Sequence, residues 1–274
     1  MSVIKKTAAI NDLSGTGRCS LTVALPVLCA MGINCSVLPT AVLSNHTGYP
    51  EYYFDDYTDK MECFMDNWEK IGIKFDSIYT GFLGSEKQIE TVIKFMNMFR
   101  KDDTVIVVDP VMGDNGHMYA TYTEELCNEM KRLVSYADIV TPNITEACIL
   151  TGSEYHGEHM SDKEIIRIAE KICSLGAKSA VITGQKDGNI IKNFACSHGE
   201  IKTFEGELIP HYYSGTGDVF ASVITGMVTL GYDVFSAVER ATDFVYKTTK
   251  FSYDNKIDSN DGVCFEKFLD ELMF

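Results

Sequence analysis

Long apolar runs, secretion signals and clusters of basic residues are all missing from this 274-residue sequence. No apolar run is long enough to cross a bilayer, so no membrane span is expected. The opening residues, Met1 to Lys6, do not lead into the apolar core of a secretion signal. From these absences we expect a soluble, cytoplasmic protein with no membrane partner.

Positive charge is scarce, since 24 Lys and Arg stand against 39 Asp and Glu and give a formal net charge of -15. The basic residues form no cluster larger than adjacent pairs such as Lys5-Lys6 and Arg100-Lys101. Nucleic acid and anionic membrane surfaces are therefore not expected as partners. An anionic substrate would have to be held by backbone N–H groups or by a metal ion.

No Cys-x-x-Cys motif occurs among the nine cysteines, which are odd in number and spread along the chain. Most of them lie within apolar stretches. This pattern favours reduced, buried thiols in a reducing compartment over disulfides or a zinc site.

Linkers, repeats and low-complexity segments are also absent, so we expect a single domain over residues 1–274. Strand-like and helix-like apolar segments alternate along the chain, and the β-branched run at residues 104–108 is typical of a strand buried in a parallel sheet. The alternation predicts βαβ units in a three-layer α/β/α fold with a mostly parallel central sheet. An antiparallel hairpin is expected near residues 190–204, and a short final helix over residues 264–272.

Most of the unusual polar residues follow a predicted strand. In an open α/β sheet, ligands bind at the carboxyl ends of the strands, so these side chains are expected at one edge. The candidates are Asp12, Ser14, Asn45, Thr47, Asp109, Asp114, Asn143, Glu146, Thr183 and the turn at residues 214–218.

The turn at residues 214–218, Ser-Gly-Thr-Gly-Asp, precedes apolar residues at helical spacing. A helix that begins inside this turn would direct unpaired N–H groups and its positive dipole end at an anion. Asp218 would lie beside that anion, where its natural task is to take a proton from the attacking group. The alternative is a plain helix cap. The spacing matches neither a P-loop nor the dinucleotide fingerprint.

Two carboxylates, Asp109 and Asp114, flank an apolar turn after the buried strand at residues 104–108. Hard oxygen ligands in small number suit Mg²⁺, while the alternative is a turn in which Asp114 bonds its own backbone. Asn143 and Glu146 either hold waters around the same ion, or Glu146 lies in the first turn of a helix. Thr183 and Gly184 either contact a nucleotide phosphate or end a strand.

The loop at residues 44–49, Ser-Asn-His-Thr-Gly-Tyr, offers hydroxyl, amide, imidazole and aromatic groups near the same edge. This set suits a small polar heteroaromatic substrate, and the alternative is a surface turn. The acidic, aromatic segment at residues 49–59 is either a lid over the site or an oligomer contact.

Together, the motifs at residues 44–49, 80–84, 109–114, 141–146 and 215–218 resemble the pyridoxal kinases of the ribokinase-like superfamily. The resemblance covers about residues 8–250. It implies ATP- and Mg²⁺-dependent phosphorylation of the 5′-hydroxymethyl group of a vitamin B6 vitamer, which is pyridoxal, pyridoxine or pyridoxamine. It also implies a homodimer, and it leaves open whether a monovalent cation such as K⁺ is required.

The resemblance further implies roles for individual residues. Asp218 would take the proton from the substrate hydroxyl, and the N–H groups of Gly215, Thr216 and Gly217 would form an anion hole. Asp109 and Glu146 would organise Mg²⁺, and the ATP phosphates would meet Asp114, Asn143, Thr183 and Gly184. The pyridine ring would be held by Asp12, Ser14, Asn45, His46, Thr47 and Phe82.

Two departures from the pyridoxal kinase pattern leave the substrate open. Residues 12–18 lack the usual Gly-x-Val-Gly-Asn and are similar to the hydroxymethylpyrimidine kinases of thiamin synthesis, the second candidate. Phe82 stands where many pyridoxal kinases carry Tyr, so it can stack but cannot donate a hydroxyl. A third alternative is a non-catalytic vitamer-binding or regulatory protein of the same fold.

Overall fold

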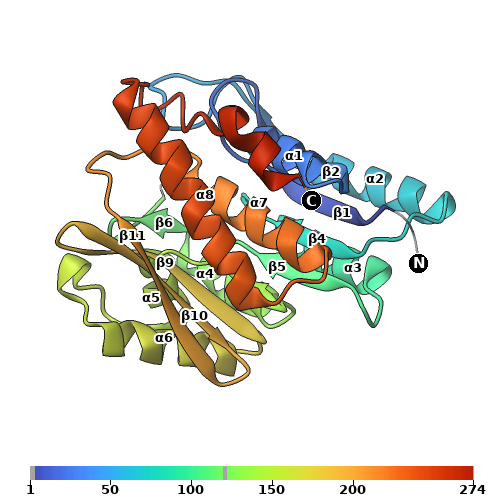
Figure 1. Cartoon of the computed structure of the whole chain (residues 1–274). Helices are drawn as coiled ribbons and strands as arrows, with labels where there is room; N and C mark the ends of the chain where they lie inside the picture. The colour runs from blue at the N-terminus through green and yellow to red at the C-terminus, as the bar shows by residue number, and fades with distance from the viewer. Residues whose placement is uncertain (1–3, 120–121, 274) are drawn as a thin grey trace.

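One nine-stranded sheet, in the order β11-β10-β9-β8-β5-β4-β1-β2-β3, runs through the computed structural model, which describes residues 4–119 and 122–273 (Figure 1). The six strands from β9 to β2 in this order are parallel, β3 is antiparallel at one edge, and β10 and β11 are antiparallel at the other. The strands of the sheet are β1 (Lys6–Ser14), β2 (Asn34–Leu43), β3 (Phe54–Asp56), β4 (Ser77–Thr80), β5 (Val105–Val108), β8 (Ile139–Val140), β9 (Ser179–Asp187), β10 (Ile190–Ser197) and β11 (Glu200–Glu207).

Helices cover both faces of this sheet. The helices are α1 (Leu21–Ala30), α2 (Thr58–Lys70), α3 (Glu86–Phe99), α4 (Glu124–Val134), α5 (Ile144–Thr151), α6 (Asp162–Ser174), α7 (Thr216–Thr229) and α8 (Val234–Asp254), with 3₁₀ helices η1 (Gly157–His159) and η2 (Phe265–Leu272). One core holds residues of α1, α7, α8 and η2, and the other holds residues of α2 to α6. Figure 1 shows α7 and α8 side by side across one face.

The central strands β5 and β8 are wholly apolar because helices cover both faces of the sheet there. Ala8 and Ile10 of β1 belong to the core under α2 to α6, whereas Ala9 between them belongs to the core under α1, α7 and α8. Successive side chains of a strand point to opposite faces, so a strand between two helical layers needs apolar residues at every position. The predicted three-layer fold with a mostly parallel sheet is confirmed. That residues 1–274 form one domain stays a prediction, which the continuous sheet supports.

The first strand is longer than the sequence suggests. Asp12 and Ser14 were expected to follow the first strand, but β1 continues to Ser14, so Asn11 and Asp12 are strand residues. The pairing of β1 with β2 changes register between Asn11 and Leu13. An irregularity of this kind redirects a side chain next to a site, which is where these two polar residues lie.

The edge strand β3 and the small hairpin of β6 (Gly113–Asp114) and β7 (His117–Met118) were not expected, and α5 was expected only as the alternative interpretation of Glu146. The hairpin turns at Asn115 and Gly116, which have φ angles of 51° and 80°, as a tight hairpin turn requires. The hairpin near residues 190–204 is confirmed as β10 and β11, and the final helix is present but is of the 3₁₀ type.

All nine cysteines are free thiols, as expected, but Cys29 and Cys63 are exposed rather than buried. Both lie on the outer sides of α1 and α2, where apolar neighbours in sequence do not imply burial. Across residues 4–119 and 122–273, no helix combines the length and the apolarity that a membrane span needs.

Candidate functional site

The two glycines of the turn before α7 lie in different surroundings. Gly215 caps the helix with a φ of 77°, and a Cβ added there would lie 2.9 Å from the carbonyl carbon of Arg18. Gly215 is therefore needed for the turn and for its packing against the 15–18 loop. A Cβ at Gly217 would meet no neighbour within 4 Å. This open space in front of the first turn of α7 is available to an anion.

Asp218 lies in that first turn and is held by the first strand. Its Oδ1 accepts a hydrogen bond of 3.2 Å from Asn11 Nδ2. Burial, with a further contribution from the charge of Asp12, raises the pKa of Asp218 from the usual 3.8 to about 6. A carboxylate with such a pKa is still charged at neutral pH and is a better proton acceptor than an exposed one.

Asp12 is 7% exposed and its carboxylate accepts two serine hydroxyls. Ser14 Oγ donates to Oδ2 over 3.0 Å, and Ser20 Oγ donates to Oδ1 over 2.5 Å. Burial raises the pKa of Asp12, while the two hydroxyls act against the rise. Ser14 itself has no exposed surface. Its hydroxyl therefore orients Asp12, and a direct contact of Ser14 with the substrate stays a prediction.

Asp109 follows β5 and is buried, at 7% exposed. Thr141 Oγ1, which follows β8, donates to its Oδ1 over 3.2 Å. Burial and then the charge of Asp218 raise the pKa of Asp109, and no basic group acts on it within the described chain. Asp109 and Asp218 therefore lie near enough to repel each other, which leaves a place for a cation.

Glu146 and Asn143 form a capping box at the start of α5. Asn143 Oδ1 accepts the Glu146 N–H over 3.0 Å, and Glu146 Oε2 accepts the Asn143 N–H over 2.8 Å. Glu146 Oε1 also accepts the N–H of Met112 over 3.1 Å. Burial, followed by the charge of Asp109, raises the pKa of Glu146. Both Glu146 oxygens thus bind backbone, as the alternative of a residue in a first helical turn predicts.

The side chain of Asn143 also ties α5 to the turn after β5, because its Nδ2 donates to the carbonyl oxygen of Gly113 over 2.8 Å. Asp114 bonds its own neighbourhood, since Oδ1 accepts the N–H of Asn115 over 2.8 Å. The turn alternative for Asp114 is therefore what the structure shows. Its contact with a phosphate stays a prediction.

Thr183 and Gly184 are strand residues of β9 rather than the turn that ends it. Thr183 is linked to Asn143 by a parallel bridge, which brings it to the same edge. The N–H of Gly184 already donates to Asn193 Oδ1 over 3.1 Å. This N–H is therefore occupied, contrary to the expectation that it is free for a nucleotide phosphate.

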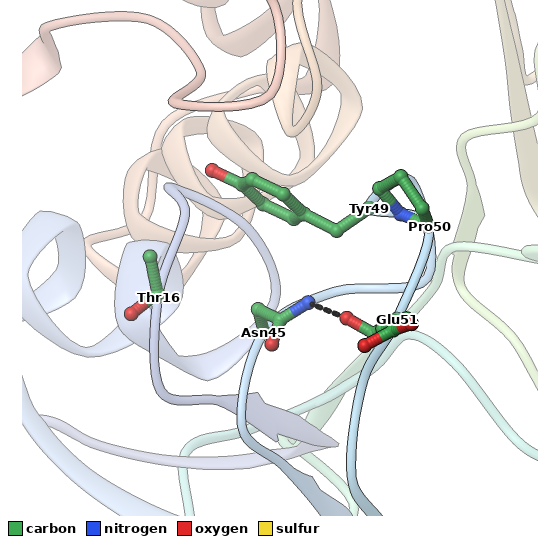
Figure 2. A pocket seen from close by; sticks show the side chains of 5 residues that line it. All are labelled: Thr16, Asn45, Tyr49, Pro50 and Glu51. Atoms are coloured by element: carbon green, nitrogen blue, oxygen red, sulfur yellow. Dashed lines mark hydrogen bonds between the residues drawn. The ribbon is translucent and has the colours of Figure 1, made fainter.

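The loop after β2 forms one wall of a cavity of about 460 Å³, lined by Thr16, Asn45, Tyr49, Pro50 and Glu51. Figure 2 shows the Tyr49 ring extending across this cavity toward the loop of Thr16, while Asn45 Nδ2 reaches the Glu51 carbonyl oxygen over 2.8 Å. Thr47 at the loop tip is exposed. The cavity is open, its lining combines apolar and polar groups, and it can admit a small ring.

A loop near the end of the chain, residues 258–262, was not expected to contribute and closes this region. His46 Nε2 and the Asn260 carbonyl oxygen are 2.8 Å apart, and Tyr49 Oη donates to Asp261 Oδ1 over 3.2 Å. Arg18 Nη1 also donates to the Asp261 carbonyl oxygen over 2.9 Å. This 258–262 loop thus joins the loops after β1 and β2. This loop does not follow a strand, so the expectation that site residues follow the strands did not identify it.

Phe82 follows β4 and is half-buried, with its ring against the core under α2 to α6. Its N–H donates to Asn11 Oδ1 over 2.8 Å, and its carbonyl oxygen accepts Thr40 Oγ1 over 2.9 Å. Phe82 is therefore placed by its backbone, and Asn11 is a further residue of this edge that sequence reasoning missed.

These contacts bring the ends of five parallel strands together. Asn11 in β1 contacts Asp218 and the N–H of Phe82 after β4. Asp109 after β5 contacts Thr141 after β8, and Thr183 in β9 is bridged to Asn143. Among residues 4–119 and 122–273, no set of three or more His, Cys, Asp or Glu side chains forms a metal-binding group. The edge therefore combines acid groups and an open helix start.

The sequence profile of the family described as phosphomethylpyrimidine kinase matches residues 35–263. The chain is 29% identical to the pyridoxal kinase of Arabidopsis thaliana over 208 residues, which are 72% of this chain and 65% of that protein. The chain thus spans just under two thirds of the length of this relative.

Solved structures agree over almost the whole chain. A Bacteroides thetaiotaomicron protein, provisionally named a phosphomethylpyrimidine kinase, has 39% identity and a TM-score of 0.96, with coverage of 99% of this chain and 94% of that one. A second crystal form of that protein contains pyridoxal. The pyridoxal kinase of Lactobacillus plantarum has 30% identity, a TM-score of 0.89 and coverage of 99% and 97%. By these matches the chain belongs to the pyridoxal kinase family of the ribokinase-like superfamily.

Proposed function

We propose that this protein is an ATP-dependent kinase that phosphorylates the 5′-hydroxymethyl group of a vitamin B6 vitamer, in the salvage of pyridoxal 5′-phosphate. One observation carries the proposal: Asp218 stands charged but with a raised pKa at the open start of α7. There it can take the hydroxyl proton while the helix start receives the phosphoryl group. The pyridoxal bound to the Bacteroides protein supports the choice of substrate.

Catalysis of this transfer is mainly positioning and charge stabilisation, to which the base adds a smaller part. The N–H groups of residues 215–217 face the transferring group, and Asp12 with its two serine donors faces the ring. Asp114, Asn143 and Thr183 lie toward the ATP phosphates, and Asn45, His46, Thr47 and Phe82 surround the vitamer. These roles follow the family resemblance and the place of each residue at the sheet edge.

Mg²⁺ fits the acid groups of this edge. Asp109 is buried beside Asp218 with no basic partner acting on it in the described residues, and oxygen ligands of this kind suit Mg²⁺. Asp109 would hold the ion, and Glu146 would stand behind it with its oxygens already bonded to backbone. Mg²⁺ takes only one or two carboxylates together with phosphates and waters, so a larger ligand group is not required. When bound, the ion neutralises charge on the phosphates.

We also place the protein in the cytoplasm as a homodimer. Nine free thiols suit a reducing compartment. Tyr52, Tyr53 and Phe54 are exposed at the edge strand β3, and an unpaired apolar edge favours an oligomer contact for the 49–59 segment over a lid. Sedimentation of the wild type and of Tyr53→Lys tests this, since the variant should sediment as a monomer.

The test of the function is ADP release measured with pyridoxal, pyridoxine, pyridoxamine and hydroxymethylpyrimidine as acceptors. We expect ADP release with the B6 vitamers. The highest kcat/KM of the four acceptors should be that of a B6 vitamer. A preference for hydroxymethylpyrimidine would instead establish the second candidate, which the family profile and residues 12–18 favour. Vitamer binding without any ADP would establish a non-catalytic binding protein.

Turnover is expected to fall in acid below about pH 6. A proton acceptor must start in its charged form, and burial raises the pKa of Asp218 from 3.8 to about 6. Because the pKa is raised, the protonated and inactive form accumulates as the pH falls through this value, with a loss of about tenfold per pH unit below it. The profile of kcat/KM, which reports the free enzyme, checks this. A flat profile down to about pH 5 would contradict the role of Asp218.

A further inference from the structure

We propose that Asn11 is a positioning residue that holds the Asp218 carboxylate at the start of α7, and that residue 81 is glycine to make room for the Asn11 side chain. The inference rests on the proposed function, because it gives Asn11 a part in the same phosphoryl transfer. No motif of the sequence pointed to this residue.

The orientation of the Asn11 amide is determined by its backbone partners. One side-chain atom accepts the N–H of Asp12 over 2.9 Å and the N–H of Phe82 over 2.8 Å. Both partners can only donate, so this atom must be the carbonyl oxygen Oδ1. The NH₂ group is therefore forced to the opposite side, where it meets Asp218 Oδ1 at 3.2 Å.

The partner of this NH₂ group is a carboxylate that must stay charged and fixed in place. Asn11 has no exposed surface, so water does not replace its amide as a donor. A hydrogen bond from a buried donor to a carboxylate stabilises the charged form and fixes its direction. The charge of Asp12 has the opposite effect and raises the pKa of Asp218. The carboxylates of Asp109 and Asp218 also repel each other. Two donors oppose these effects and lower the pKa of Asp218, first the backbone N–H of Ser20 and then the side chain of Asn11, which is the side-chain donor.

Gly81 completes the arrangement from β4. Its φ is not among the positive φ angles of the described chain, so the backbone would accept an alanine. A Cβ at this position would nevertheless lie 2.5 Å from Asn11 Cγ and would overlap both amide heteroatoms. The amide cannot turn aside without breaking its three hydrogen bonds. The side chain of Asn11, rather than the backbone of residue 81, is therefore what requires glycine.

The test is a double-mutant cycle between Asn11→Ala and Gly81→Ala, with kcat for the vitamer as the readout. Each single variant is expected to lower kcat by about 10- to 100-fold, the effect of losing a hydrogen bond to a charged group. The Kd of a non-hydrolysable ATP analogue should stay within about twofold. Gly81→Ala should have no further effect in the Asn11→Ala background, where no amide remains to be displaced.

Two further variants separate positioning from loss of stability. Asn11→Asp keeps an acceptor for both N–H groups but directs an oxygen at Asp218, so it should fold and still lose turnover. Ser77→Ala is the matched control, because it removes a buried hydroxyl that contacts Thr7 and Thr229 at the amino end of β4, away from the site. It should lower the Tm and leave kcat unchanged.

A wild-type kcat in folded Asn11→Asp would overturn the inference, and so would effects that multiply in the double variant. If the wild type itself makes no ADP with any acceptor, the proposed function fails, and the crystal structure of Gly81→Ala still decides the inference. We expect that structure to show the Asn11 amide displaced and the Asp218 carboxylate turned from its place. An unmoved Asp218 would overturn it.

Discussion

Asp218→Asn is expected to lower kcat by about 10²- to 10⁴-fold, the usual contribution of a general base, while the Kd of ATP changes little. The variant keeps the shape of the side chain, and its amide oxygen can still accept the hydrogen bond from Asn11 Nδ2. What it removes is the proton acceptor at the start of α7. Steady-state kinetics with a saturating B6 vitamer, together with calorimetric titration of an ATP analogue, measure the two quantities separately.

Asp233→Asn provides the matched control for this variant. Asp233 caps α8, the helix that packs beside α7, and its Oδ1 accepts the N–H of Ser236 over 3.0 Å. Asn caps a helix about as well as Asp, so both stability and turnover should remain. A kcat of Asp218→Asn close to that of Asp233→Asn would remove Asp218 from the chemistry, and with it the basis of the proposed function.

Gly215→Ala and Gly217→Ala are expected to differ in their effect on stability, although the two glycines are two residues apart. Gly215 has a φ of 77° and packs against the Arg18 carbonyl, so an alanine there combines backbone strain with overlap. We expect a loss of about 2–5 kcal/mol in the free energy of unfolding, or roughly 5–15 °C in Tm, with loss of activity. Thermal unfolding followed by circular dichroism measures this.

Gly217→Ala should leave the Tm within about 2 °C of the wild type, because its Cβ meets no neighbour and alanine favours a helix. The Cβ would instead enter the space in front of α7, so we expect a lower kcat/KM for ATP without a loss of stability. Full activity in Gly217→Ala would show that the transferring group does not come close to this turn. An equal loss of stability in both variants would contradict the distinction.

Local sequence predicts those parts of the site whose shape and chemistry are both determined within one short segment. The turn before α7 joins two glycines, an acid and a helical apolar pattern within about a dozen residues, so both its shape and its chemistry could be predicted. Asp109 follows a run of β-branched residues that marks a buried strand, which predicts its position at the sheet edge. The three-layer fold could be predicted in the same way, from the alternation of strand-like and helix-like apolar segments along the chain.

The remaining parts depend on contacts between distant segments. Asn11 is one polar residue after an apolar run, and nothing nearby distinguishes it from a loop residue. Its meaning comes from Gly81 and Asp218, which lie 70 and 207 positions away. The spacing of Asn143 and Glu146 was consistent either with holding waters around a metal ion or with the first turn of a helix. Only the contact of Glu146 with Met112 shows that Glu146 also supports the turn after β5. Side-chain packing across the sheet thus supplies what periodicity cannot.

The 258–262 loop has a consequence for the order of events during synthesis. Domains emerge from the ribosome with their N-terminal part first, and the loops of Arg18 and His46 are made long before Asn260 and Asp261, which bind them. A nascent chain that stops short of residue 258 can pair its parallel strands but leaves His46 and Tyr49, in the loop beside the cavity, without these partners. The loops of Arg18, His46 and Tyr49 therefore gain their last contacts late, after the sheet is complete.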